Sequence, residues 1–145
     1  MHIELLPDSF NALRKLEQYQ TSLSQSGEYG AMSNFIGTMR NINESKDIVE
    51  MFLEHYPGMT EKSLTNIVHT AEQQWKIIDS LLVHRIGNIQ PNDSIVLVAV
   101  WSAHRVDAFE ACRYIMEQLK STAPFWKRET TKNSHHWVEK NTPGK

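Results

Sequence analysis

Two lysines seven positions apart, Lys120 and Lys127, are the side chains in this sequence best suited to acid–base or nucleophilic chemistry. The second follows an apolar run ending in Phe125 and Trp126, and Arg128 comes directly after it. A lysine held against aromatic side chains and beside another cation loses stabilisation of its charge, so its pKa falls. A neutral amine can then act as a base or a nucleophile. The structural alternative is that Lys120 suits the dipole of a helix end and Lys127 extends from a packed Trp126 into solvent.

A second candidate site lies in the segment "WSAHRVDAFE", where a strand that ends at Trp101 leads into a helix. We expect Ser102 to be the N-cap, which places His104 and Arg105 in the first helical turn. The helix dipole disfavours cations there unless an anion binds to the free backbone N–H groups. The pair therefore predicts an anion site, and the alternative is that Arg105 pairs with a carboxylate such as Asp107.

The other candidates carry less chemical information. Arg40 opens a polar loop after a strand, and an arginine at such a position is most often solvated. His135 and His136 are adjacent and would face opposite sides of a strand, and no carboxylate–histidine cluster has ligand spacing, so we expect no metal site. Cys112 falls in the apolar stripe of a helix and is expected to pack there. P-loop, dinucleotide and nucleophile-elbow motifs are absent, so we expect no cofactor.

Two main helices are predicted from the spacing of apolar residues, over residues ~60–76 and ~103–120. Thr60 is the expected N-cap of the first, with Glu61 favourable in its first turn. A shorter helix is expected in "NALRKLEQYQ". Because helices and strands are mixed without a regular βαβ rhythm, the sequence predicts an α+β fold with a mixed or antiparallel sheet.

The strands show three different patterns. In "DIVEMFLEHY", Val49, Met51 and Leu53 share one face and acidic residues the other, which predicts a strand with one wet face. In "AMSNFIGTMR", Gly37 predicts a bulge or a close backbone approach. "SIVLVAVW" is apolar on both faces, so both must be covered. Since the two main helices are expected on one face of the sheet, we predict that another chain covers the second face. Further strands are expected in "IELLPDSF", "IIDSLLVHRIG" and "HWVE".

Length and composition describe an ordinary globular chain of 145 residues, with 40% hydrophobic and 22% charged residues. We expect one domain over residues 1–145, with a less certain segment at 1–30 and a flexible tail at 141–145. The net charge of −2 indicates no nucleic-acid partner, so any anion site must be local. The single cysteine fits a reducing cytoplasm. We expect no signal peptide and no membrane interaction, since no run approaches ~20 apolar residues.

Several segments, taken in chain order, resemble the large, catalytic subunit of molybdopterin synthase. They are "FIGTMRN", "LEHYPGM", "LVHRIG", "VAVWSAHRVDAFEACRYIMEQLK", "APFWKRE" and "WVE", and they extend from about Ala31 to Glu139. The block that reads "SAHR…AFEA…LK…APFWKRE" is long and specific. The resemblance implies an α+β fold of the α/β-hammerhead type.

The resemblance also implies an activity and a set of partners. The family transfers sulfur to cyclic pyranopterin monophosphate and so forms the dithiolene of molybdopterin. The sulfur donor is the C-terminal thiocarboxylate of a small ubiquitin-like subunit, whose tail enters a pocket of the large subunit. The large subunits form a homodimer within a heterotetramer.

By resemblance, Lys120 and Lys127 match the two catalytic lysines of the family. The substrate-binding residues are Arg40, His104 and Arg105, and we expect Phe125 and Trp126 to form a pocket wall. Under this hypothesis the lysines hold the thiocarboxylate while the other cations hold the phosphate of the pterin, with Arg40 acting in its own subunit or across the dimer.

Two positions depart from the family pattern. Asn92 stands in a turn where the family often has glycine, and asparagine tolerates such a turn. The loop before "WV" reads "KNSHH" rather than Asp-Gly-rich. Three rival functions remain: a non-catalytic protein that binds a ubiquitin-like tail, a nucleotide or phosphate module that uses the "SAHR" helix start, and a metal-dependent hydrolase.

Overall fold

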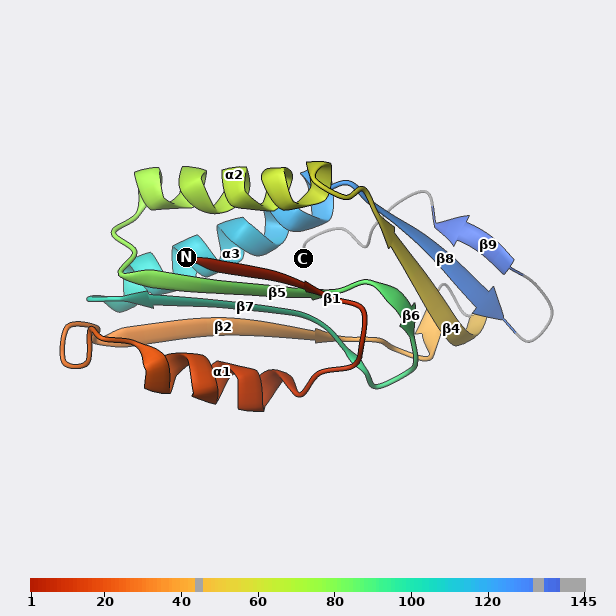
Figure 1. Cartoon of the computed structure of the whole chain (residues 1–145), viewed down its shortest axis with the longest axis horizontal. Helices are drawn as coiled ribbons and strands as arrows, with labels where there is room; N and C mark the ends of the chain where they lie inside the picture. The colour runs from red at the N-terminus through yellow and green to blue at the C-terminus, as the bar shows by residue number, and fades with distance from the viewer. Residues whose placement is uncertain (44–45, 132–134, 139–145) are drawn as a thin grey trace.

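The computed structural model describes residues 1–43, 46–131 and 135–138. In chain order its elements are β1 (His2–Leu6), α1 (Ala12–Ser22), β2 (Ala31–Thr38), β3 (Ile42–Asn43), β4 (Lys46–His55), α2 (Met59–Gln74), β5 (Asp79–Arg85), β6 (Gly87–Ile89), β7 (Ser94–Ser102), α3 (Arg105–Thr122), β8 (Phe125–Thr131) and β9 (His135–Val138) (Figure 1). The predicted α+β class is confirmed. The expected tail at 141–145 lies outside the described residues.

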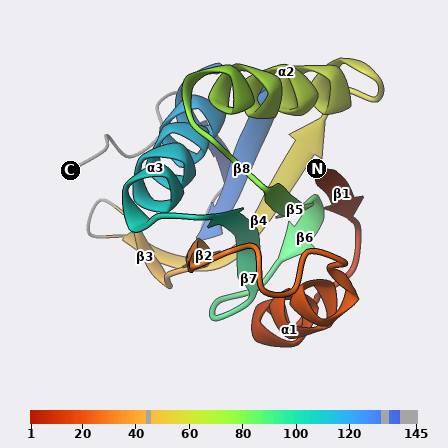
Figure 2. The ribbon, with the colours of Figure 1, turned by 90° about the vertical axis from the view of Figure 1, so that its left-hand side faces the viewer.

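The first sheet has the strand order β1-β5-β7-β2. β1 runs parallel to β5, while the β5–β7 and β2–β7 pairs are antiparallel. Figures 1 and 2 show α2 and α3 on one face of this sheet and α1 on the other. The larger core lies between the sheet and the helix pair, where Leu82, Val96, Val98 and Val100 pack against apolar side chains of both helices.

The second face of β7 is covered by α1 of the same chain. Leu97, Ala99 and Trp101 pack against Ala12 and Leu16, which are four residues apart and so share one side of the short helix. The prediction that another chain covers this face is therefore wrong. It failed because the apolar face of α1 was not recognised from the sequence. The apolar residues on both faces of β7 therefore give no support for a dimer.

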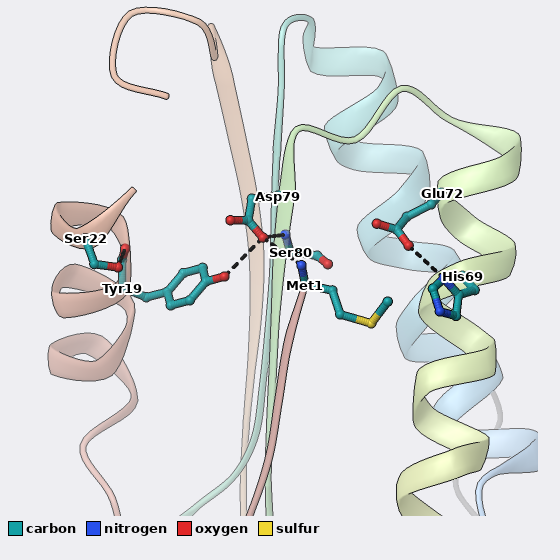
Figure 3. Close-up of polar contacts among 7 residues, drawn as sticks. All are labelled: Met1, Tyr19, Ser22, His69, Glu72, Asp79 and Ser80. Carbon is teal, nitrogen blue, oxygen red and sulfur yellow. Dashed lines mark hydrogen bonds and ion pairs between the residues drawn. The ribbon is translucent and has the colours of Figure 1, made fainter. Parts of the chain in front are cut away.

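A polar cluster fastens α1 to the start of β5 (Figure 3). The Tyr19 hydroxyl donates a hydrogen bond of 3.0 Å to Asp79 Oδ1. The same oxygen accepts the Ser80 backbone N–H at 2.7 Å and lies 3.2 Å from the terminal amino group of Met1. Burial, with the nearby carboxylate, raises the pKa of Tyr19 to about 12, so the phenol keeps its proton and remains a donor.

The second sheet has the order β3-β4-β8-β9, and β6 also pairs with β4. On β4 the buried side chains are Ile48, Met51 and Leu53, whereas Val49 is 40% exposed. The expected stripe of Val49, Met51 and Leu53 is thus corrected at its first member. The cause is a register shift between Ile48 and Glu50, since a bulge reverses the side on which earlier residues point.

Both main helices begin one or more residues away from the predicted N-caps. Gly58 precedes α2 with a positive φ of 84°, and its N–H donates to the Glu61 carboxylate at 3.1 Å. Thr60 is instead fully buried. α3 is preceded by His104, because Ser102 still belongs to β7 and is buried there. Within the described residues, no helix is long and apolar enough to cross a membrane.

Candidate functional site

The two candidate lysines lie on either side of the short connection between α3 and β8. Lys120 is in the last turn of α3, and Lys127 is the third residue of β8. Thr60, in the first turn of α2, holds this connection in place: its hydroxyl donates a hydrogen bond of 3.1 Å to the Pro124 carbonyl. The same hydroxyl accepts the Tyr56 N–H at 2.9 Å, so it ties the segment before β8 to the start of α2.

Both lysines line one cavity of about 160 Å³. Its walls come from β2, β4, β5, β7, α3 and β8, which meet where the two sheets join. The lining residues are Phe35, Gly37, Thr38, Leu53, His84, Ile95, Val96, Leu119, Lys120, Ala123, Phe125 and Lys127. The cavity is therefore mostly apolar, with two ammonium groups and few other polar side chains, which is an environment that strengthens electrostatic contacts with a bound anion.

Lys127 has a pKa lowered from 10.5 to about 8. Burial is the largest cause, because it disfavours the charged amine. The charge of Lys120 and a hydrogen bond with it lower the pKa further, and Glu129 offsets part of the effect. The side chain is still mostly protonated at neutral pH, yet it can lose its proton within a range in which enzymes work. This is the behaviour expected from a lysine held against an aromatic wall.

The alternation of β8 separates the two aromatic residues expected to form that wall. Phe125 points to the same side as Lys127 and lines the cavity. Trp126 points to the opposite side, is 49% exposed and does not line the cavity. Within one subunit, Phe125 occupies the position expected for the wall and Trp126 does not.

Arg128 shares the outer face of β8 with Trp126. Its guanidinium carbon lies 5.2 Å from the Phe52 ring centroid and 5.8 Å from that of Trp137. Phe52 and Trp137 are the residues paired with Arg128 on the two neighbouring strands. This stack stiffens the second sheet behind Lys127.

His84 lines the cavity and was missed from the sequence. It is only 4% exposed, and its ring stacks on Phe125 with 4.2 Å between centroids and 16° between planes. Burial lowers its pKa to about 4, and the charges of Lys120 and Lys127 contribute. The imidazole is therefore neutral at physiological pH. The available signal was a lone histidine in the otherwise apolar strand "LLVHR", but its neighbours in the cavity come from distant segments.

Gly37 forms part of the cavity wall, and the predicted bulge is confirmed by a register shift between Gly37 and Thr38. A Cβ at Gly37 would lie 3.0 Å from Val96 Cγ1 and 3.2 Å from Phe35 Cε1. The glycine thus keeps the wall thin between two side chains that also line the cavity.

His104 and Arg105 are exposed at the opposite end of α3 from Lys120. Fifteen helical positions separate Arg105 from Lys120, which corresponds to about 22 Å at ~1.5 Å per residue. His104 makes no side-chain capping hydrogen bond to the helix. Within one subunit, this pair does not share a site with the two lysines.

Arg40 lies two residues beyond Thr38, which ends β2 and lines the cavity; Arg40 is exposed and is not one of the lining residues. The backbone before it is fixed, since Met39 donates its N–H to Asp93 and accepts the N–H of Asn92, both at 2.9 Å. Asn92 adopts a positive φ of 74°, as expected for asparagine at a glycine-like turn position.

Neither a metal centre nor a reactive thiol emerges from the part of the chain that the structure describes. No group of three or more His, Cys, Asp or Glu side chains in it could hold a metal ion. Cys112 lies on the buried face of α3, and burial raises the pKa of its thiol, so it is a packing residue.

Comparison with known proteins gives consistent matches. The MoaE protein family model matches residues 11–122. The molybdopterin synthase catalytic subunit of Ralstonia nicotianae is 56% identical over 112 residues, covering 77% of this chain and 64% of that protein. The chain therefore spans less than two thirds of that relative. The Escherichia coli K12 protein of the same name is 49% identical over 117 residues, covering 81% of this chain and 78% of that protein.

Solved structures agree. Molybdopterin synthase from Staphylococcus aureus superposes with a TM-score of 0.82 at 31% identity, covering 93% of this chain and 95% of that one. The MoaE protein from Burkholderia ambifaria MC40-6 gives a TM-score of 0.78 at 40% identity, covering 94% and 88%. The family match, which covers most of the chain, and the sequence identities confirm the resemblance: this chain belongs to the MoaE protein family.

Proposed function

We propose that this chain is the catalytic subunit of a molybdopterin synthase, a sulfurtransferase of the cytoplasm. It would transfer sulfur from the C-terminal thiocarboxylate of a small ubiquitin-like subunit to cyclic pyranopterin monophosphate and so form the molybdopterin dithiolene. The observation that carries the proposal is that Lys120 and Lys127 line one narrow, mostly apolar cavity. The relatives that bear the name molybdopterin synthase catalytic subunit support it.

The cavity suits the end of a peptide chain that carries a negative charge. A volume of about 160 Å³ admits a chain terminus without bulky side chains, such as one that ends in glycine. The two ammonium groups would hold a carboxylate or thiocarboxylate there by charge-assisted hydrogen bonds. A complex of subunits 1 and 2 of molybdopterin-converting factor from Helicobacter pylori 26695 has the same fold, with a TM-score of 0.80 at 18% identity.

Each of the two sulfurs is added in two steps, so one dithiolene consumes two thiocarboxylated tails. The thiocarboxylate sulfur forms a bond to an oxygen-bearing side-chain carbon of the pterin as the carbon–oxygen bond there breaks and the oxygen leaves as phosphate oxygen or water. The acyl group of the small subunit stays on the sulfur as a thioester. Water attacks the thioester carbonyl carbon and releases the small subunit as a carboxylate, while sulfur remains on the pterin. Lys120 and Lys127 would stabilise the developing oxyanion, and the low pKa of Lys127 would let it move a proton.

The position of His104 and Arg105 favours a dimer in which two chains share a site. These residues lie about 22 Å along α3 from Lys120, too far for one phosphate-bearing pterin to contact both groups within a subunit. A second chain that placed its own helix start beside the cavity would complete the cation set with Arg40. We therefore propose a homodimer, with one small subunit bound at each Lys120–Lys127 cavity.

The test is product formation from purified components. This chain is mixed with cyclic pyranopterin monophosphate and the thiocarboxylated small subunit of the same organism, and dithiolene product is detected by mass spectrometry after alkylation of its thiols. The small subunit with an ordinary carboxylate end is the control. The proposal expects product only with the thiocarboxylate. A stable complex that yields no product would instead support the non-catalytic binding protein.

A further inference from the structure

His84 is a buried polar side chain that lines the cavity. It lies near the end of β5, on the face that α2 and α3 cover, and is only 4% exposed. Stacking on Phe125 fixes the plane of the ring. A hydrogen bond of 2.7 Å between Nδ1 and the Arg85 carbonyl oxygen fixes its rotation.

That hydrogen bond determines which ring nitrogen carries the proton. A carbonyl oxygen only accepts, so Nδ1 must be the donor. A neutral imidazole then has a lone pair on Nε2. The bond through Nδ1 leaves this lone pair for another donor, and His84 lines the cavity. An acceptor at the wall of a mostly apolar cavity gains most from a donor on the group that fills the cavity, which points to a ligand that brings such a donor.

The chemistry of the cavity limits what this donor can be. Lys120 and Lys127 supply donors suited to an anion, and most other lining side chains are apolar. Thr38, a further uncharged polar side chain in the lining, is exposed. A ligand that complements the cavity therefore has an anionic group close to an N–H group. The last residue of a peptide chain has this arrangement, because its amide nitrogen and its carboxylate carbon are bonded to the same Cα.

We propose that His84 is a specificity-determining residue, whose Nε2 accepts a hydrogen bond from the amide N–H of the final residue of the sulfur-carrier tail while Lys120 and Lys127 hold its carboxylate or thiocarboxylate. This inference rests on the proposed function. It gives the cavity a means to recognise the backbone of the tail in addition to its charge, and a way to set how deeply the tail enters.

The test replaces one atom of the ligand. The small ubiquitin-like subunit of the same organism is prepared by semisynthesis with a C-terminal Gly-Gly, or with the last glycine replaced by glycolate, which changes the amide N–H to an ester oxygen. Affinities are measured by calorimetry for the wild type. The amide tail is expected to bind about 10-fold more tightly than the ester tail, as for one buried hydrogen bond.

Two variants remove Nε2 and each keeps a different structural contact of His84. His84→Phe retains a ring that can stack on Phe125, and His84→Asn retains an N–H that can donate to the Arg85 carbonyl. In both, the amide and ester tails should bind equally within about twofold. Thr38→Val is the matched control in the same cavity and should keep the 10-fold preference.

The outcomes separate the two proposals. If the wild type binds neither tail, the proposed function fails. If the wild type binds both tails equally, or if either folded His84 variant keeps the full preference for the amide, the role of His84 is overturned. Circular dichroism melting identifies a variant that does not fold, and the other variant then decides.

Discussion

Lys127 is poised to exchange a proton near neutral pH because its pKa is about 8. At pH 7 most molecules carry the ammonium, which can hold an anionic tail, and a minor fraction carries the free amine. The neighbouring Lys120 and a bound anion act on the pKa of Lys127 in opposite directions. The charge of Lys120 disfavours the charge of Lys127, whereas an anion bound between the two side chains favours the charged form of Lys127. Ligand binding and protonation at this cavity are therefore coupled.

The first prediction is that the tail takes up protons when it binds. The anionic tail raises the pKa of Lys127, so at pH 8 a site that is about half protonated gains up to roughly half a proton. Calorimetry in two buffers with different ionisation enthalpies measures this uptake. Lys127→Arg, which is always charged, should show much less. Equal uptake by the wild type and Lys127→Arg would contradict the assignment.

The second prediction concerns His84 and stability in acid. Its folded-state pKa of about 4 lies below the unfolded value of 6.5. Between these values the unfolded chain binds more protons, so the free energy of unfolding falls as the pH falls from 6.5 to 4. This loss of stability arises because protonation of His84 in the folded chain would place a charge on a buried ring near the charges of Lys120 and Lys127.

Urea unfolding of the wild type and His84→Phe at pH 7 and pH 4.5 measures this effect. Between the two pH values, the variant should lose less free energy of unfolding than the wild type, by on the order of 2 kcal/mol. An identical loss in both proteins would show that His84 is not the group responsible.

At the scale of elements, a single buried hydroxyl links the start of α2 to the segment that leads into β8. Thr60 is 0% exposed and joins the Tyr56 N–H to the Pro124 carbonyl. It thereby links the first turn of α2 to the segment that carries Phe125 and Lys127. A substitution that keeps the shape of Thr60 and removes its hydroxyl tests this connection.

The third prediction is therefore that Thr60→Val lowers the free energy of unfolding by about 1–3 kcal/mol, because it removes two part-buried hydrogen bonds, each worth roughly 0.5–1.5 kcal/mol. Chemical denaturation measures the change. Thr65→Val is the matched control on the same helix, since the Thr65 hydroxyl bonds to Glu61 in an exposed position. Its effect should stay within about 0.5 kcal/mol. Equal effects of the two substitutions would contradict the role of Thr60.

The sequence predicts an element where the pattern is local and fails where the partner is distant. The apolar periodicity of α2 and α3 and the bulge at Gly37 can be predicted from the residues of those segments alone. The exposure of Val49 cannot be predicted in this way, because it follows from a register shift between β4 and β8. The packing of α1 on β7 likewise depends on contacts between segments that are far apart in the sequence. Without that information, the second apolar face of β7 led to the prediction of a second chain.

The same distinction applies to the site. Lys120 and Lys127 stand out because two cations accompany aromatic residues within a short segment, and the structure places both in one cavity. The different orientations of Phe125 and Trp126 follow from the alternation of a strand that was not predicted for this segment. His84 was missed because its neighbours Phe125, Lys120 and Lys127 are about 40 positions away in the sequence, and only the fold brings them together.

At the scale of the whole molecule, the cations fall into two groups. Lys120, Lys127 and Arg40 lie at one end of the first sheet, whereas His104 and Arg105 lie at the other. A site that uses all five requires two chains. Mixed dimers can distinguish a shared site from two separate ones.

The fourth prediction uses subunits that carry Lys127→Ala or Arg105→Ala, each inactive alone. If the site is shared, a mixed dimer contains one site with both defects and one intact site. Random mixing after unfolding and refolding should then restore about a quarter of the wild-type activity. If each chain holds a complete site, mixing restores none. The absence of restoration in dimers verified by mass spectrometry would contradict the shared site.

The most direct test of the central claim is the rate of a single turnover of sulfur transfer at the Lys120–Lys127 cavity. The preformed complex with the thiocarboxylated small subunit is mixed with cyclic pyranopterin monophosphate, and product is followed by rapid quench. We predict losses of at least ~100-fold for Lys120→Ala and Lys127→Ala, with the complex intact by gel filtration. Lys76→Ala, an exposed lysine just beyond α2, should retain the wild-type rate. Wild-type rates in both cavity variants would contradict the account.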